Sequence, residues 1–181
     1  MPDLIGAVRL ERKWGHLQLA GVARQIGYQQ SNASRHHFGW GASASGIFAI
    51  GKDFAMASFT YGDGIARYFN DLGGRGYDAV ITPDGRVEPL RAYGGYVGYT
   101  HHWNERWRSN LTGSAVVLER NVFLAPGAFR SSQYAATNLI FQASPTFTAG
   151  VEGLYGRLEL QDGQSASVGR LQISLKYDIV R

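Results

Sequence analysis

The sequence predicts an all-β protein, an antiparallel transmembrane β-barrel, from three observations. Apolar and polar residues alternate with a period of two over most of the chain, as in strands with one apolar and one polar face. Glycine and aromatic residues are abundant, with 24 Gly, 10 Tyr, 9 Phe and 4 Trp among 181 residues. The links between the periodic segments are alternately short and long. This pattern is typical of outer-membrane barrels with short periplasmic turns and longer external loops.

The alternation predicts nine strands, and it is clearest near the C-terminal end, where Leu171, Ile173 and Leu175 share one face. We expect the strands at about 4–12, 15–28, 38–50, 53–68, 91–103, 106–120, 133–143, 146–160 and 166–178. Tight turns are expected at 13–15, 51–52, 104–105 and 144–145. The longer links are 29–37, 69–90, 121–132 and 161–165. If the last strand runs toward the periplasm, every long link is external.

Composition excludes several other classes of protein. The absence of cysteine excludes a disulfide framework, a thiolate zinc site and a cysteine nucleophile. No apolar run approaches the roughly 18 residues of a membrane-spanning helix. The net charge of +4 comes from scattered basic residues, so we expect no nucleic-acid partner. Because no nucleophile elbow and no regular metal-binding spacing occurs, we predict no enzyme, no cofactor and no metal site.

The environment of the apolar face separates three interpretations. A soluble sandwich or a lipocalin-like carrier would bury this face, whereas a membrane barrel turns it toward lipid. Tyr and Trp gather at strand ends, as the aromatic girdles of membrane barrels require, and the apolar face is rich in Gly and Ala. Both features favour the membrane.

Nine is an odd number of strands, and bacterial single-chain barrels have even numbers. Either two segments form one strand of a closed eight-stranded barrel, or the chain is part of a larger barrel. The residues after Met1 lack the pattern of a secretory signal, so we expect either a cytoplasmic protein or an internal piece of a longer exported chain. Between the two barrels, the missing signal favours a part of a larger one.

Several segments carry a resemblance to a known family. They are 61–74 (YGDGIARYFNDLGG), 76–80 (GYDAV), 14–21 (WGHLQLAG), 94–99 (GGYVGY) and 152–157 (EGLYGR). The chain resembles the DcaP-like family of Gram-negative outer-membrane porins over nearly its whole length. The resemblance implies an outer-membrane location, a barrel of about sixteen strands and a homotrimer. It also implies passive diffusion of small anionic solutes such as dicarboxylates. Residues 1–181 are then a single barrel domain or the C-terminal part of one.

Strand parity predicts the residues that line the lumen. A charged side chain facing lipid costs about 2–4 kcal/mol at the bilayer midplane, so the charged residues between the apolar ones are expected to point inward. A wall with more cations than anions attracts anionic solutes, and guanidinium groups bind carboxylates in a bidentate manner. The predicted charged lining consists of Arg9, Glu11, Arg24, Arg106, Arg108, Arg120, Glu152, Arg170 and Lys176. Gln18, Asn110, Thr112 and Gln172 are the neutral residues predicted beside them.

The link 69–90 has two interpretations. It is rich in charge and could fold over the mouth or contact a neighbouring subunit. The turn residues Gly73-Gly74 and Pro83-Asp84-Gly85 favour a simple connecting loop. An alternative function also stays open: a small closed barrel that binds ligands or supports the envelope without conducting.

Overall fold

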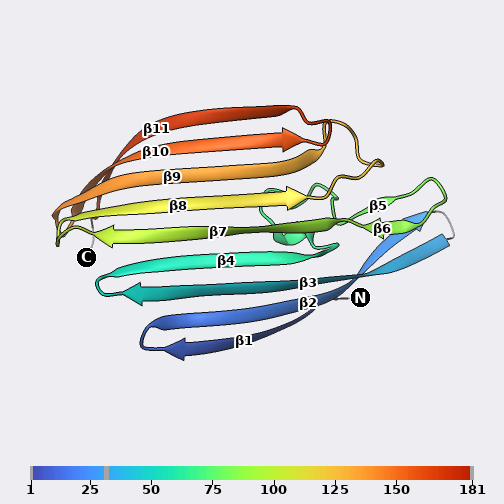
Figure 1. Ribbon diagram of the computed structural model, residues 1–181, viewed down its shortest axis with the longest axis horizontal. Coiled ribbons are helices and arrows are strands. Elements are labelled where there is room, and N and C mark those ends of the chain that lie inside the picture. Colours follow the sequence, from blue (N-terminus) through green and yellow to red (C-terminus); the bar gives the residue numbers. More distant parts are fainter. Residues whose placement is uncertain (1, 31–32, 180–181) are drawn as a thin grey trace.

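The computed structural model describes the backbone of residues 2–30 and 33–179, and their side chains except at 28–34. Nine strands form one antiparallel sheet in which neighbours in sequence are neighbours in space (Figure 1). They are β1 (Leu4–Arg12), β2 (Gly15–Gln30), β3 (Ala33–Ile50), β4 (Asp53–Asp63), β7 (Arg91–His102), β8 (Trp107–Leu118), β9 (Phe129–Ser144), β10 (Phe147–Leu160) and β11 (Ser165–Tyr177).

The nine predicted strands are confirmed, and of the two alternatives left open by their odd number, the closed eight-stranded barrel is wrong. No two of the predicted strands merge, and β1 and β11 form the two edges of the sheet within the described part of the chain. Each edge strand therefore pairs along one side only. A sheet in lipid needs every edge paired, because an unpaired backbone amide or carbonyl has no water to bind there. The architecture is an open part of a barrel.

The prediction of a long link at 29–37 is wrong. β2 and β3 remain paired from Arg24 opposite Gly39 to Gln30 opposite Ala33, so the two strands are joined by residues 31–32, which lie outside the described residues. The pair projects beyond the end of β4 as a two-stranded arm (Figure 1). Polar residues suggested a loop here, but a pair of strands that leaves the sheet does not cover an apolar core and needs no apolar alternation.

The pairing register separates the sheet into two faces. Residues directly opposite one another point to the same side, so each row of partners belongs to one face. One face, called here the apolar face, carries Leu171, Ile173 and Leu175, which are exposed by 75%, 75% and 71%. The other, called the polar face, carries in one row Gln18, Ser45, Ser58, Tyr96 and Ser114. A soluble fold with these leucines in a dry interior is therefore excluded.

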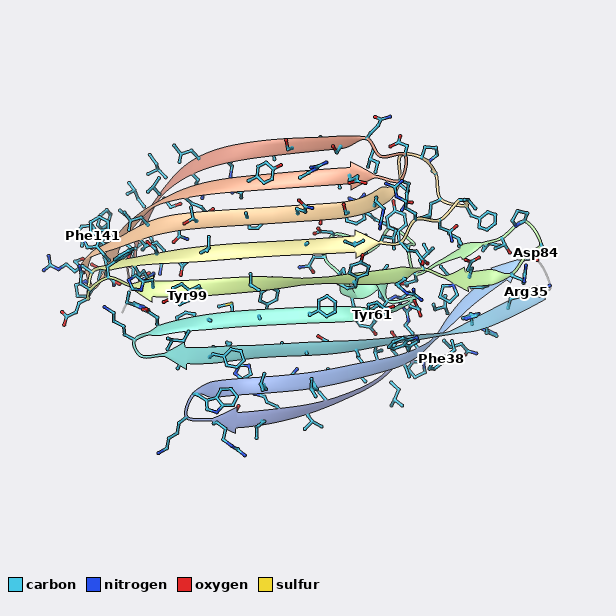
Figure 2. All side chains as sticks on the ribbon, viewed as in Figure 1. Arg35, Phe38, Tyr61, Asp84, Tyr99 and Phe141 are labelled. Carbon is cyan, nitrogen blue, oxygen red and sulfur yellow. The ribbon has the colours of Figure 1, made fainter. Side chains whose placement is uncertain are left out.

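Aromatic side chains mark both ends of the strands. Figure 2 shows Tyr99 and Phe141 toward the end with the tight turns, and Tyr61 and Phe38 toward the opposite end. Amphipathic aromatic rings at two levels are the arrangement expected for the two interfaces of a bilayer. Among the described residues, no helix combines the length and apolarity needed to cross a membrane.

The buried core lies on the polar face and not between two sheets. The segment 64–90 connects β4 to β7 and contains the short helix η1 (Ala66–Tyr68) and the strands β5 (Ala79–Ile81) and β6 (Val87–Pro89). Its apolar side chains pack on residues at the ends of three barrel strands. The cluster consists of Ile65, Ala66, Phe69, Leu72, Val80 and Leu90 with Ala92, Leu118 and Phe129. The segment is thus folded onto the sheet and is more than a connecting loop.

Candidate functional site

The polar face with the segment 64–90 on it is the candidate functional site. β4 was predicted to continue to residue 68, but it ends at Asp63 because Gly64 adopts a φ of 72° and turns the chain onto the polar face. A side chain at Gly64 would also approach the Ile26 Cδ1 atom to 2.2 Å. The first residue of the segment therefore favours glycine for its backbone conformation, and any larger residue would also displace the end of the Ile26 side chain.

Arg24 on β2 holds this segment in place. Its side chain is only 2% exposed, and its Nη1 donates to the Gly64 carbonyl oxygen at 2.7 Å and lies 3.0 Å from Asp78 Oδ2. Its Nε lies 3.5 Å from Asp3 Oδ1, an ion-pair contact without a hydrogen bond. The guanidinium carbon lies 5.9 Å from the centre of the Tyr68 ring. Arg24 is on the polar face as parity predicts, but the segment covers it.

The carboxylates around Arg24 have further partners. Asp78 accepts from the backbone amide of Arg67 at 3.0 Å and from its Nε at 2.8 Å, and Asp3 Oδ2 accepts from the Tyr68 hydroxyl at 2.6 Å. The bond to Asp78 raises the pKa of Arg67, and the bond to Asp3 raises the pKa of Tyr68. Two arginines and two carboxylates thus balance in charge, which is the condition under which buried charges are tolerated.

Two contacts tie the far side of the segment to the sheet. The Tyr77 hydroxyl accepts from the backbone amide of Phe129 at 3.2 Å, and the Ser132 hydroxyl donates to Asp71. Ser132 belongs to the polar face because it lies opposite Val116 in the register. The segment therefore spans the polar face from β2 to β9.

The remaining predicted lining residues divide into three groups. Arg9 and Glu11 lie on the polar face and form an exposed ion pair of 2.8 Å with one another. Lys176 lies on the same face and pairs with Asp178 at 3.0 Å. Arg106 belongs to the turn between β7 and β8, outside the strands, so parity does not assign it to a face.

Arg120 also lies outside the predicted strand. β8 ends at Leu118, and the Arg120 guanidinium contacts Glu159 at 3.2 Å beyond the end of the strand. The predicted strand 106–120 was too long at both ends, since a tight turn precedes Trp107 and the chain leaves the sheet after Leu118. Its two terminal arginines therefore do not belong to a strand face.

Arg108, Glu152 and Arg170 lie on the polar face around a row of uncharged polar groups. The register forms this row across five neighbouring strands, each residue lying opposite the next. The row consists of Thr100, Asn110, Asn138, Glu152 and Gln172. Within this row Thr100 donates to the Asn110 carboxamide at 2.6 Å, and Asn110 Nδ2 donates to Asn138 at 2.9 Å. Thr112 lies one step along β8 on the same face. These groups form a wall of hydrogen-bonding side chains with charges on both sides of it.

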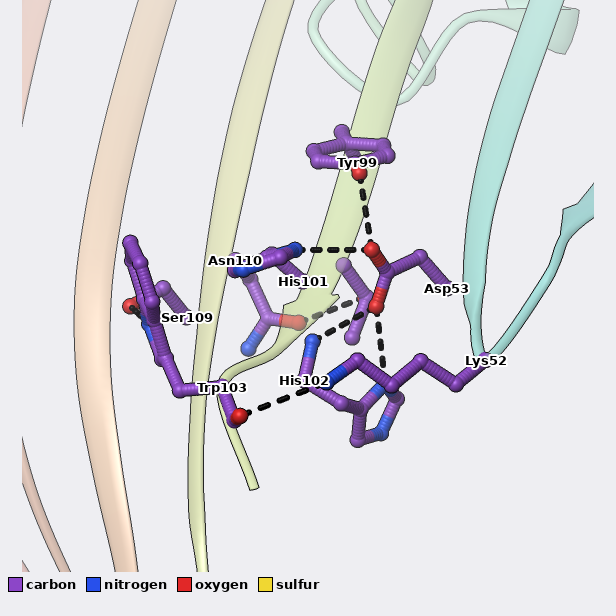
Figure 3. Close-up of polar contacts among 9 residues, drawn as sticks. Lys52, Asp53, Tyr99, His101, His102, Trp103, Ser109 and Asn110 are labelled. Atoms are coloured by element: carbon purple, nitrogen blue, oxygen red, sulfur yellow. Dashed lines mark hydrogen bonds and ion pairs between the residues drawn. The ribbon is translucent and has the colours of Figure 1, made fainter.

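A second polar cluster lies where β4 begins. Asp53 accepts from the Tyr99 hydroxyl at 3.0 Å and from the backbone amide of His102 at 2.7 Å, and its Oδ2 lies 2.7 Å from His101 Nδ1 (Figure 3). Strand parity turns the side chains of His101 and His102 to opposite faces. Asp53 nevertheless contacts both residues, because it binds the ring of His101 and the backbone amide of His102. Across the described ranges, no group of three or more His, Asp or Glu is arranged to hold a metal ion.

The sequence-based prediction missed three members of the site, which are Asp3, Asp78 and Tyr68. All three lie outside the strands of the sheet, so period-two alternation carries no information about them. The one signal in the sequence is the density of Asp and Arg between 63 and 91, which equally suits a solvated loop.

The two faces and the inserted segment define a class of protein. The geometry offers a polar surface with an ordered segment folded on it and an exterior suited to lipid, which is the wall of a transmembrane β-barrel. The chain is similar to the outer membrane channel DcaP of Acinetobacter baumannii, with a TM-score of 0.82 and 21% sequence identity over 98% of this chain. It spans about half of that channel, 51% of its length. The similarity confirms the barrel fold that the sequence predicts.

A second solved structure is more distant. The NanC porin aligns with 98% of this chain and 93% of its own length at a TM-score of 0.44 and 13% identity. No protein-family model matches the chain, and neither does any curated protein.

Proposed function

We propose that this chain forms the C-terminal part of an outer-membrane porin that passes small hydrophilic, anionic solutes by passive diffusion. The observation that carries the proposal is the division of the sheet into two faces. Leu171, Ile173 and Leu175 are exposed on one face, and the other carries the polar row and the segment 64–90. Only a barrel with lipid outside and water inside accommodates both surfaces.

The preference for anions is supported by the charges that remain available on the polar face. Arg24 is covered, and Arg9 and Lys176 each have a carboxylate partner. Arg108 and Arg170 have no hydrogen-bond or ion-pair partner among the described residues, and Glu152 is the one unpartnered carboxylate placed near them. Two unpaired guanidinium groups against one carboxylate favour carboxylate solutes over cations.

The segment 64–90 narrows the water-filled passage in this proposal. It lies at the end of the sheet where the longer links gather, so it occupies the external mouth if the tight turns are periplasmic. Its buried anchor and its contacts to β9 make it a fixed obstruction. The DcaP-like resemblance further suggests a homotrimer in the outer membrane, with lipid around its circumference.

Ion selectivity of the complete channel tests the proposal. In planar bilayers with a potassium chloride gradient, we expect a reversal potential of anionic sign. Replacing Arg108 and Arg170 together by Gln should move it toward zero. Arg120→Gln is the matched control, because Arg120 is paired with Glu159 and lies off the polar face. Absence of conductance would refute the porin function, and an unchanged reversal potential in the double variant would refute the assignment of these two arginines.

A further inference from the structure

The apolar face has a hollow near the end with the tight turns. It has a volume of about 780 Å³ and extends from the β7–β8 turn across β8, β9 and β10 to β11. Its lining combines small residues with larger aliphatic ones. The small residues are Ser109, Thr137 and Gly153, and the aliphatic ones are Leu139, Val151 and Leu171. The register places all six on the apolar face. The hollow is therefore a groove on the face that the barrel turns toward lipid.

Two tryptophans lie at the end of this groove that is nearest the β7–β8 turn. Trp103 is 59% exposed, and its indole Nε1 donates to Ser109 Oγ at 3.0 Å, while its ring packs edge-on against His101 at 4.3 Å (Figure 3). Trp107 stacks on Phe141 with ring centres 4.6 Å apart. Held in this way, the rings mark the level at which a bilayer changes from acyl chains to headgroups.

Two cations lie beside the tryptophans at the same level. Lys52 Nζ donates to the Trp103 carbonyl oxygen at 3.2 Å, which brings the ammonium group to the β7–β8 turn (Figure 3). The backbone of Arg106 is held by Asn104 Oδ1 at 2.9 Å, and its guanidinium has no partner among the residues that the structure describes.

The nearby carboxylates form no ion pair with these cations. Asp53 is already occupied by Tyr99, His101 and His102, with contacts of 2.7–3.0 Å. Glu105 is the other carboxylate near these two cations, and it lies in the β7–β8 turn. Neither cation has a carboxylate partner among the described residues, so both are available to the phosphate of a negatively charged headgroup.

We propose that this groove binds an anionic phospholipid, with one acyl chain along Ser109, Thr137 and Gly153 and the headgroup phosphate between Lys52 and Arg106. The site rests on the membrane location in the proposed function, but it does not depend on conduction. An uncharged or zwitterionic lipid would gain the same apolar contacts without the attraction between charges. The site therefore predicts a preference for the headgroup and not for the acyl chain.

Native mass spectrometry tests this site. The complete channel is released from nanodiscs that contain equal amounts of dioleoyl phosphatidylglycerol and dioleoyl phosphatidylcholine, and the retained lipids are counted. We expect phosphatidylglycerol to be retained in excess, and Lys52→Gln and Arg106→Gln each to lower that excess roughly fivefold. Arg120→Gln removes a cation far from the groove and should change nothing.

A second variant tests the groove itself. A Cβ atom at Gly153 would meet no atom within 4 Å, so Gly153→Leu fills the groove without displacing the backbone. We expect it to reduce retention of both lipids. The matched control is Gly6→Leu, which adds the same bulk to the apolar face of β1, where a Cβ also meets no atom within 4 Å.

The outcomes separate the two proposals. Equal retention of the two lipids by the unmodified channel, or equal behaviour of Gly153→Leu and Gly6→Leu, would overturn the lipid site. Conductance recorded on the same samples tests the porin function separately. A channel that prefers phosphatidylglycerol but does not conduct would refute the proposed function alone.

Discussion

The buried guanidinium of Arg24 controls the position of the segment 64–90, and its removal should be measurable in two ways. Arg24→Met keeps a long apolar stem but removes every donor. The lost contacts are those to Gly64 at 2.7 Å, to Asp78 at 3.0 Å and to Asp3 at 3.5 Å, from a side chain 2% exposed.

The expected magnitude follows from what the partners retain. Breaking a buried ion pair by removing one member costs about 3–5 kcal/mol, because the other charge is left without compensation. Asp78 keeps its bond to Arg67, and Asp3 keeps its bond to Tyr68. We therefore expect a loss near the lower end of that range, about 3 kcal/mol in the free energy of unfolding.

The assay compares urea unfolding and single-channel conductance of the complete channel in lipid bilayers. Arg67→Met is the matched control. It contacts the same Asp78 from a side chain that is 57% exposed, and an exposed pair contributes about 1 kcal/mol or less. Arg24→Met should also raise the conductance and its fluctuations, since the segment loses its anchor on β2. A loss no larger than that of Arg67→Met, with unchanged conductance, would refute the anchoring role.

Three further predictions concern the polar face and the segment 64–90 that folds onto it. Removing the charge of Glu152 by Glu152→Gln should raise the anion preference in reversal-potential measurements, and Arg170→Gln should lower it. Each shift should be a few-fold at most, since one charge near a wall in water contributes about 1 kcal/mol. Gly64→Ala should destabilise the barrel by about 1 kcal/mol or more in urea unfolding, because of its positive φ, 72°. The pKa of Tyr68 is raised above the ordinary 10.0 by its bond to Asp3. The contribution of this bond to stability should therefore be complete below pH 10 and be lost as the pH rises through the raised value. Unfolding that is independent of pH in this range, or that responds equally in Tyr68→Phe, would contradict this assignment.

The strands and their faces were predictable because side-chain direction in a strand is a local property. Successive residues point to opposite sides whatever the rest of the chain does, so the alternation around Leu171 and Arg170 assigns both residues correctly to opposite faces. Strand ends were less predictable. The β2–β3 arm lacks the apolar alternation that a half-buried strand shows, and the end of β4 depends on one glycine conformation.

The candidate site was predictable in part. Parity placed Arg108, Glu152 and Arg170 on the polar face, where the register has them. It could not show that Arg24 is covered, because Gly64 and Asp78 reach it from a distant part of the chain.

The sequence alone determined which residues share a face and how many strands the sheet contains, since both depend on backbone geometry repeated residue by residue. The tertiary structure decided which charges on the polar face remain open to a solute. That outcome depends on where the segment 64–90 folds and on the ion pairs it forms, and Coulomb attraction between side chains acts through space without regard to their separation along the chain.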